Sequence, residues 1–495
     1  MPAKFELIAP CFFGCESTAK FELNRIGAEN IRVDDGRLTF SGGAEMIAAA
    51  NLHLRTVERV MLLLARYKAS TFDELFDGVY SVPWEDLLPT DAAFPVTGSS
   101  LDSQLSSVPA CQSIIKKAVV KRLMAKHHTS VLPESGTEYK IRFMLRKNVC
   151  EIMLDTTGEG LHKRGYRRNA MEAPIRETLA ATIADLGRVR RDSLVEDPFC
   201  GSGTLLIEAA QKAMNIAPGL KRRFAAERYS FVPAAVWAEQ RQKALAESKL
   251  DVGFEAFGYD IDPAAVALAN ANAKLAGVGD RCRFEVADVK DFRALDNATV
   301  LTNPPYGERL GDASEAASLA KTLGQVWQAH PAQGLYAITA DADFEQHFGK
   351  KAARRRKIVE QRHHGGDGGI EFQVLRVLAH LADGLVDGGF HLGPDALAGN
   401  QTFAQSPHPL QEAAAAPDAG AGPGSGFFEV ADKHLIHPQG IRAELPDDIV
   451  GIHHVAPGLG HLLPVLPQDH AVAGPLGIGF RGGHHADVVK EFVPE

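Results

Sequence analysis

The stretch that decides the fold of this 495-residue chain is Asp197-Pro198-Phe199-Cys200-Gly201-Ser202-Gly203-Thr204. It follows the apolar pair Leu194-Val195 and precedes the helix-like run 205–210. Glycines let the backbone of such a turn approach a ligand closely, and the helix behind it offers free N–H groups to anionic or polar ligands. By itself the stretch is also compatible with a purely structural strand-to-helix turn. Other parts of the sequence are therefore needed to distinguish a ligand-binding turn from a structural one.

The spacing around this turn separates the classes of nucleotide site. A dinucleotide fingerprint needs Gly-x-Gly-x-x-Gly and an acid about 20 residues later, but the next acid that ends a strand is Asp260, 57 residues after Gly203. A P-loop needs Gly-Lys-Ser/Thr, which is absent. A loop that begins with Asp197 and lacks a phosphate-binding lysine fits a ligand with an amino-acid ammonium and no phosphate, such as S-adenosylmethionine (SAM).

Two further acids end the strands that follow. Asp260 can accept hydrogen bonds from the two ribose hydroxyls, and Asp288 can accept one from the adenine amine. Ligands of open α/β sheets bind at the carboxyl ends of the strands. The sequence therefore predicts that Asp197, Asp260 and Asp288 meet at one edge of a sheet.

A second motif, Asn303-Pro304-Pro305-Tyr306-Gly307, follows the apolar Val300-Leu301. The lone pair of an exocyclic base amine is conjugated into the ring, so two fixed acceptors on its N–H groups favour the nucleophilic geometry. The Asn303 side-chain oxygen and the Pro304 carbonyl can supply these acceptors on a backbone that the prolines hold rigid. Tyr306 can stack on a flipped base. An ordinary proline-rich turn with a packing tyrosine is the alternative for this motif alone.

On both sides of these motifs, predicted strands and helices alternate. Strands are expected at 194–197, 254–262, 283–288, 299–307 and 334–340, and helices at 174–187, 203–214, 234–250, 263–276 and 314–329. This rhythm predicts a parallel, doubly wound sheet. Residues 368–378 fit a final strand poorly.

The N-terminal part has another pattern. Strands are expected at 5–8, 31–35, 37–42, 138–148 and 149–157, helices at 16–26, 44–67 and 110–127, and strands and turns across 69–107. This mixture predicts a small α+β module.

The combination of DPFCGSGT and NPPYGERLG with LDTTGEGLHKRGYR (154–167) resembles bacterial THUMP-domain RNA methyltransferases, most closely the ribosomal large-subunit RNA guanine-N2 methyltransferase (RlmL-like) family, over residues 3–357. The resemblance implies a ferredoxin-like subdomain (1–65), a THUMP RNA-binding domain (66–160) and a Rossmann-like class I methyltransferase domain (161–380). It implies catalytic roles for Asn303, Pro304 and Tyr306. The implied cofactor-binding residues are Asp197, Phe199, Gly201, Gly203, Thr204, Asp260, Asp288 and Asn303.

Basic clusters are candidates for the RNA-binding surface. One lies on the helix at 110–127 and another lies between the THUMP-like and methyltransferase regions. A solvated helix face explains any single cluster as well, but several clusters on one methyltransferase favour phosphate contacts, which position a nucleic acid rather than specify its sequence. The predicted RNA-binding residues are Lys117, Lys121, Arg122, Arg164, Arg167 and Arg168.

The formal charge of −9 comes from the tail. Residues 361–495 hold 6 Lys+Arg against 16 Asp+Glu, which leaves 47 against 46 for residues 1–360. The acidity therefore does not exclude an anionic partner for the body of the chain. Residues 381–495 are of low complexity and are expected to be a disordered, largely irregular extension, in which paired histidines lack the spacing of a metal site.

No apolar run approaches the roughly 20 residues of a membrane span, the N-terminus shows no signal-peptide pattern, and six scattered cysteines form no metal or disulfide framework. A cytoplasmic protein without a membrane or metal partner is expected.

The sequence thus predicts SAM-dependent N2-methylation of a guanine in RNA, with 23S ribosomal RNA as the expected target. A tRNA guanine and an adenine N6 amine stay open as targets, since the Asn-Pro-Pro-Tyr motif does not separate them. A non-catalytic RNA-binding ribosome assembly factor is the alternative from another class.

Overall fold

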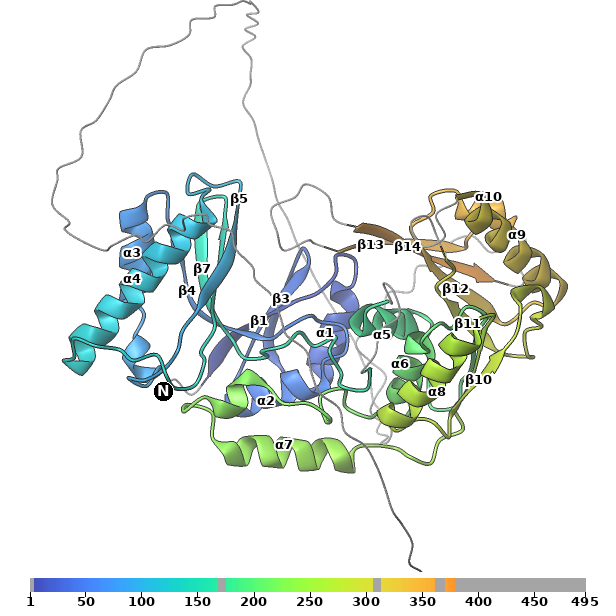
Figure 1. Cartoon of the computed structure of the whole chain (residues 1–495), viewed down its shortest axis with the longest axis horizontal. Helices are drawn as coiled ribbons and strands as arrows, with labels where there is room; N and C mark the ends of the chain where they lie inside the picture. Colours follow the sequence, from blue (N-terminus) through green and yellow to red (C-terminus); the bar gives the residue numbers. More distant parts are fainter. Residues whose placement is uncertain (1–3, 168–174, 306–312, 361–369, 379–495) are drawn as a thin grey trace, which may run out of the picture. The chain divides into compact units, whose positions relative to one another are not determined.

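The computed structural model describes residues 4–167, 175–305, 313–360 and 370–378 (Figure 1). The predictions for Arg168, for Tyr306 and for the extension at 381–495 lie outside the described residues. The described part contains two sheets. One is built from the first third of the chain and the other from strands between residues 194 and 378.

The N-terminal sheet has the strand order β2-β3-β1-β4-β7-β6-β5. All its neighbouring strands pair antiparallel except β5 and β6, which are parallel. Its elements are β1 (Phe5–Pro10), α1 (Glu16–Arg25), β2 (Glu29–Asp34), β3 (Arg37–Gly42), α2 (Ala44–His53), β4 (Met61–Lys68), α3 (Phe72–Ser81), η1 (Trp84–Asp86), β5 (Val96–Leu101), α4 (Val108–His127), β6 (Ile141–Arg146) and β7 (Val149–Asp155).

Two predictions in this module were wrong. The expected helix 44–67 ends at His53, and β4 takes its second half, pairing with β1 and β7. Hydrophobic periodicity does not distinguish a short apolar run such as 61–64 in a buried strand from one in a buried helix. In the region read as strands and turns, α3 forms behind a capping box in which Thr71 and Glu74 satisfy each other's backbone N–H groups. That Thr-x-x-Glu signal is visible in the sequence.

The C-terminal sheet has the strand order β10-β9-β8-β11-β12-β14-β13. Its first five strands are parallel and β14 is antiparallel to both neighbours, so the expected doubly wound sheet is present. Its elements are α5 (Glu177–Leu186), β8 (Leu194–Asp197), α6 (Thr204–Ala213), η2 (Ala225–Arg228), α7 (Ala234–Ala246), β9 (Glu255–Asp260), α8 (Pro263–Ala276), β10 (Cys282–Val286), η3 (Val289–Asp291), β11 (Thr299–Thr302), α9 (Ala313–Ala329), β12 (Gly334–Thr339), α10 (Phe344–Phe348), β13 (Arg354–Glu360) and β14 (Ile370–Leu378).

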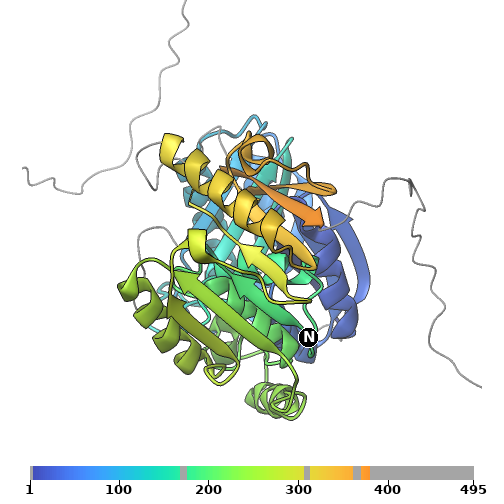
Figure 2. The same cartoon turned by 90° about the vertical axis from the view of Figure 1, so that its right-hand side faces the viewer.

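Helices cover both faces of this sheet (Figure 2). On β11, Leu301 packs with α5, α6 and α8, whereas its neighbour Val300 packs with α9 and α10. On β12, Tyr336 packs in the same cluster as Leu301, and Leu335 packs in the same cluster as Val300. Successive side chains of a strand point to opposite faces, which explains why these strands are apolar without interruption.

The hairpin β13–β14 closes the sheet beside β12, with Tyr336 opposite Arg376. By sequence alone, residues 368–378 fit a last strand poorly. The structure shows that Ile370–Leu378 is that strand and that the basic run from Arg354 begins its partner.

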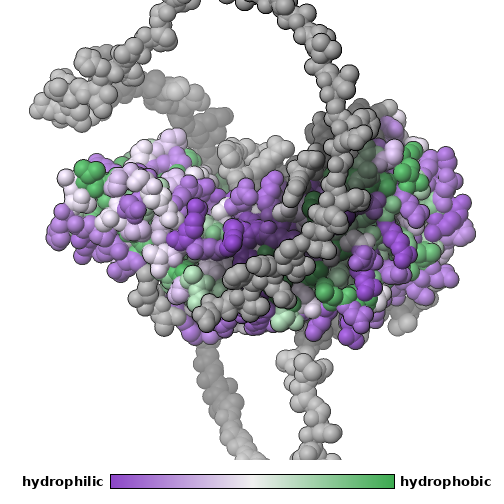
Figure 3. Space-filling model, turned by 60° about the horizontal axis from the view of Figure 1, so that its bottom comes forward, coloured by the Kyte–Doolittle hydropathy of each residue, from purple (hydrophilic) through white to green (hydrophobic). Residues whose placement is uncertain are grey.

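The long insertion between α6 and β9 packs into the N-terminal core. Phe224, Tyr229 and Trp237 are buried in the same hydrophobic cluster as β1, α2 and β7. Trp237 stacks on Phe224 with 5.4 Å between ring centroids, and Tyr229 stacks on Tyr139 at 4.4 Å. The described surface in Figure 3 is largely hydrophilic, with scattered hydrophobic patches. The insertion therefore follows the methyltransferase motif in sequence but belongs to the N-terminal core by its packing.

Candidate active site

The turn after β8 is shaped by two glycines in left-handed conformations. Gly203, at φ +78°, precedes α6, and a Cβ there would lie 2.8 Å from Phe284 Cζ and 3.1 Å from Ala269 Cβ. Gly201, at φ +51°, has no neighbouring heavy atom within 4 Å of the place where a Cβ would stand. One glycine is thus required by close packing, and the other faces open space in which a ligand has room.

Asp260 ties this turn to the end of the neighbouring strand. Its Oδ2 accepts a hydrogen bond from the Gly201 N–H at 2.9 Å, and its Oδ1 accepts one from the Asp262 N–H at 3.0 Å. The Cys200 N–H donates to the Tyr259 carbonyl at 2.9 Å. Each carboxylate oxygen keeps lone pairs beyond these bonds, so Asp260 can still accept hydrogen bonds from hydroxyl groups.

Asp197 is buried at the end of β8. Its Oδ1 accepts from the Phe199 N–H at 3.0 Å. Burial raises the pKa of Asp197 from 3.8 to about 7, and the negative charge of Asp260 adds to the rise. A carboxyl in this position gains from a cation beside it, because a cation would offset the cost of desolvating the ionised form.

Asp288 follows β10 and caps η3. Its Oδ1 accepts from the Lys290 N–H at 3.0 Å, and its Oδ2 lies 3.0 Å from Lys290 Nζ. These hydrogen bonds lower the pKa of Asp288. The register aligns Asp197 with Gly258 and Asp260 with Val286, so the three acids follow three adjacent strands at the same edge of the sheet.

Asn303 and Pro304 come directly after β11, which pairs with β8 on the other side of the Asp197 turn. Val300 lies opposite Glu196, so Asn303 emerges at the edge where β8 ends. Asn303 is half-buried and Pro304 is buried. The structure thus brings Asn303 to the same edge as Asp197, as expected for parallel strands.

The remaining predicted cofactor residues, Phe199 and Thr204, help to hold the turn. Phe199 packs against the core on the α9 side of the sheet. Thr204 is buried, with its hydroxyl 3.1 Å from the Ser202 hydroxyl. The Asn272 amide donates to the Ser202 carbonyl at 3.0 Å, a contact to the turn that the sequence did not reveal.

Helix α6, which begins at this turn, is held by buried arginines. Arg164 and Glu208 are 1% and 0% exposed in their side chains and form a two-pronged ion pair at 3.4 Å. The Tyr166 hydroxyl donates to Glu208 at 3.1 Å. The Arg55 guanidinium, from the N-terminal module, donates to the Gln211 carbonyl at 3.1 Å and to that of Ile216. Sequence reasoning missed this network, for which the only sequence signal is that Glu208 stands one helical turn after Thr204.

This placement corrects part of the predicted RNA surface. The buried guanidinium of Arg164 is committed to Glu208 and to the Leu161 and Arg55 carbonyls, so it is not free to meet a phosphate. Arg167 is nearly buried and lies 3.1 Å from Glu177. A run of basic letters does not tell which arginines point inward.

The α4 cluster divides in a similar way. Lys117 and Lys121 are exposed. Arg122 forms a two-pronged pair with Glu85, with its Nε 2.8 Å from the carboxylate, and its side chain is 17% exposed. Lys117 and Lys121 therefore stay candidates for phosphate contact, and Arg122 is engaged within the protein.

Among the described residues, no group of three or more His, Cys, Asp or Glu side chains is placed to hold a metal ion. No helix in the described ranges is long and apolar enough to cross a membrane. All six cysteines are free and buried.

The sheet order, the glycine turn after β8 and the acids after β8, β9 and β10 together define a class I methyltransferase with SAM as its cofactor. The open space above Gly201 and the buried Asp197 fit a ligand with an ammonium group.

Comparisons with known proteins identify the family. Residues 6–61 match the RlmL ferredoxin-like domain, 69–155 the THUMP domain and 164–368 the RMKL-like methyltransferase domain. The Bacillus subtilis (strain 168) protein named "Putative RNA methyltransferase YpsC" is 40% identical over 358 residues, which cover 72% of this chain and 93% of that protein. The chain belongs to the THUMP-domain, class I SAM-dependent RNA methyltransferases of the RlmL-like family.

Two solved structures are similar to this chain in both sequence and fold. A "predicted N6-adenine-specific DNA methylase from Listeria monocytogenes str. 4b F2365" is 40% identical, with a TM-score of 0.70, over 75% of this chain and 96% of that one. The protein SMU.472, complexed with SAH, is 38% identical, with a TM-score of 0.71, over 77% of this chain and 100% of its own.

Proposed function

We propose that this RNA methyltransferase transfers the methyl group of SAM to the N2 amine of a guanine in large-subunit (23S) ribosomal RNA. The observation that carries the proposal is the position of Asn303 and Pro304 at the sheet edge that Asp197 and Asp260 also occupy. An acceptor pair for an exocyclic amine and a site suited to SAM thereby share one edge.

The residues of this edge have separate roles. Asp197 would face the cofactor ammonium, Asp260 the ribose hydroxyls and Asp288 the adenine amine, with the backbone at Gly201 and Gly203 giving close approach. When bound, SAM supplies an electrophilic methyl group on a positively charged sulfur. Most of the catalytic effect then comes from orientation and fixed dipoles.

Asn303 and Pro304 act on the target base. Their oxygens accept the two N–H groups of the amine, which turns the nitrogen lone pair toward the methyl carbon. Methyl transfer would form the bond between the amine nitrogen and the methyl carbon as the bond from that carbon to sulfur breaks, with SAH as the leaving group and one proton lost from the nitrogen to water, so it would need no covalent enzyme intermediate and no metal.

The proposed class of RNA substrate is supported by family membership and not by any contact in the structure. The THUMP domain favours RNA over DNA as substrate, and the ribosomal target is what the resemblance to the RlmL-like family implies. The description of the Listeria relative as an adenine-N6 DNA methylase favours a second candidate. The same acceptor pair would serve an adenine N6 amine equally well.

A non-catalytic assembly factor would be favoured by a sheet that lacks its last strand, and by sequence, residues 368–378 fit such a strand poorly. Strands β13 and β14 complete the sheet, which removes the observation in its favour.

The test is methyl transfer from labelled SAM to separated 23S rRNA, 16S rRNA and tRNA, and to DNA, followed by digestion to nucleosides. N2-methylguanosine in the 23S fraction is the expected product. The same nucleoside only in tRNA would overturn the proposed target, and N6-methyladenine would overturn the proposed base.

A further inference from the structure

A cavity of about 600 Å³ lies away from the SAM edge, between the end of β7 and the insertion that follows α6. One wall carries Glu138, Lys140 and Glu159, and the other carries Arg223, Arg228 and Tyr229. Its volume is within the range of sites that take a small ligand or a single nucleotide. The sequence did not predict this site, because its walls are about 70 residues apart in the chain.

Hydrogen bonds hold the two walls together. The Ala225 and Ala226 N–H groups donate to the Thr157 and Thr156 carbonyls at 3.2 and 3.0 Å. The Tyr229 hydroxyl donates to the Asp155 carbonyl. The Arg222 guanidinium donates to the carbonyls of residues 159, 160 and 163. The cavity is therefore formed before any ligand enters it.

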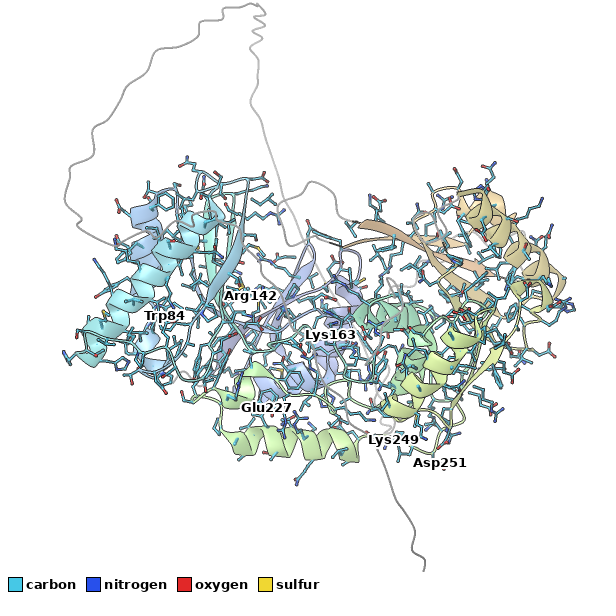
Figure 4. The ribbon with its side chains drawn as sticks, viewed as in Figure 1. Trp84, Arg142, Lys163, Glu227, Lys249 and Asp251 are labelled. Atoms are coloured by element: carbon cyan, nitrogen blue, oxygen red, sulfur yellow. The ribbon has the colours of Figure 1, made fainter. Side chains whose placement is uncertain are left out.

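Beside this cavity, two carboxylates each form ion pairs with two arginines. Asp155, with a fully buried side chain, accepts from Arg59 and Arg142, each at 2.8 Å. Glu227 accepts from Arg223 at 2.8 Å and from Arg241 at 2.6 Å. Arg142 on β6 and Glu227 on η2 are labelled in Figure 4.

The remaining charges lie at the rim. Lys140 lies 3.6 Å from Glu138, while Arg228 and Glu159 are exposed. The cavity is lined by three cations (Lys140, Arg223, Arg228) and four carboxylates (Glu138, Asp155, Glu159, Glu227), and Arg59, Arg142 and Arg241 pair with Asp155 and Glu227 from outside the lining. The rim thus offers both cations and carboxylates that are open to solvent.

We propose that this cavity binds one ribonucleotide of the substrate RNA. The exposed guanidinium groups of Arg223 and Arg228 meet its phosphate, which arginine recognises with paired N–H donors. The Glu138 and Glu159 carboxylates accept a hydrogen bond from the ribose 2′-hydroxyl, the group that distinguishes RNA from DNA. The mixture of cations and acids suits a ribonucleotide better than it suits a bare phosphate, which the carboxylates would repel.

This inference rests on RNA being the substrate and adds where the strand is held. A nucleotide fixed here, on the insertion of the methyltransferase domain, would set the distance between the held part of the RNA and the guanine at Asn303.

The first test uses the full-length protein, a twelve-nucleotide single-stranded oligouridylate and fluorescence anisotropy. Arg223→Gln/Arg228→Gln is compared with Arg190→Gln/Arg191→Gln, a pair of exposed arginines that do not line the cavity. The cavity variant should bind the RNA about tenfold or more weakly, and its slope of log K against log salt should be shallower by roughly 0.7, the value for one phosphate contact. Equal affinities for the two variants would overturn the proposal.

The second test addresses the ribose. Glu138→Gln/Glu159→Gln should reduce the preference for the RNA oligomer over its deoxy counterpart, while DNA binding holds or improves as two negative charges disappear. An unchanged preference would overturn the role given to the carboxylates.

Failure of this site and failure of the proposed function are distinguishable. If the wild-type protein makes N2-methylguanosine and the cavity variant binds RNA like the control, only the cavity proposal fails. If the cavity variant loses RNA binding but the wild-type product is another nucleoside, the proposed function fails and the site stands.

Discussion

Replacing Arg164 by Met should destabilise the methyltransferase domain, because it leaves Glu208 as a buried carboxylate without its cation. The Arg164 and Glu208 side chains are 1% and 0% exposed. Breaking such a pair from one side costs about 3–5 kcal/mol. At roughly 2–4 °C per kcal/mol for a domain of about 200 residues, Tm should fall by about 6 °C or more.

The double variant Arg164→Met/Glu208→Gln separates charge from packing. It removes the buried negative charge, and the glutamine oxygen can still accept from the Tyr166 hydroxyl, which donates to Glu208 at 3.1 Å. The carbonyls of Leu161 and Arg55 still lose a donor, at about 1 kcal/mol each. The double variant should therefore be less stable than the wild type by about 2 kcal/mol, yet more stable than the single variant.

Calorimetry of the three proteins and of Glu208→Gln completes a double-mutant cycle, and RNA affinity is measured on the same samples below their transitions. The expected result is a large coupling energy between the two positions with little change in RNA binding. A single variant with wild-type Tm and weakened RNA binding would refute the reasoning, because it would mean that Arg164 reaches a phosphate rather than Glu208.

Three further predictions concern the site. Asn303→Ala should keep SAM affinity and lose turnover by roughly a hundredfold or more; isothermal titration beside a methyl-transfer assay checks this, and loss of both would point to misfolding. Because burial raises the pKa of Asp197 to about 7, its carboxyl becomes ionised as pH rises, so SAM affinity should increase between roughly pH 6 and 8. Asp197→Asn should abolish that rise, whereas Glu196→Gln, a neighbour whose pKa is also about 7, should keep it; a rise that survives in Asp197→Asn would exclude the ammonium contact. Gly203→Ala should lose SAM binding, because a Cβ at this position, where φ is +78°, would lie 2.8 Å from an aromatic ring. The control is Gly277→Ala, where φ is +82° and only the tip of a flexible lysine lies nearby, so that this variant carries only the backbone cost of about 1–2 kcal/mol. Equal SAM binding by the two variants would contradict this account.

Local signals were sufficient wherever a function depends on neighbours in sequence. The octapeptide at 197–204 specifies its own turn, since positive φ at Gly203 and the start of α6 at Thr204 follow from residue type. The acids that end β9 and β10 and the Asn303 turn could be placed together because parallel strands end at a common edge. The expected α8 was confirmed at 263–276, where Asp262 caps its start and Gly277 ends it.

Other features needed contacts between distant residues. Nothing near Arg164 in sequence marks it as buried, because its partner stands 44 residues away. The strand at 61–68 could not be separated from a helix until β1 and β7 supplied its ladder. The poorly fitting 370–378 became a strand because β12 and β13 pair with it on both sides.

The sequence by itself therefore determined the class of chemistry. Turn-forming glycines, strand-ending acids and the Asn-Pro-Pro motif act through backbone geometry that a few adjacent residues impose. Only the tertiary structure decided which arginines are free for RNA, that the insertion at 215–246 joins the N-terminal core, and that a charged cavity forms between that insertion and β7. Whether a side chain is buried or paired depends on which surfaces meet in the folded protein. An arginine that faces inward is desolvated and one that faces outward stays hydrated, and the packing decides between the two, not the neighbours in the chain.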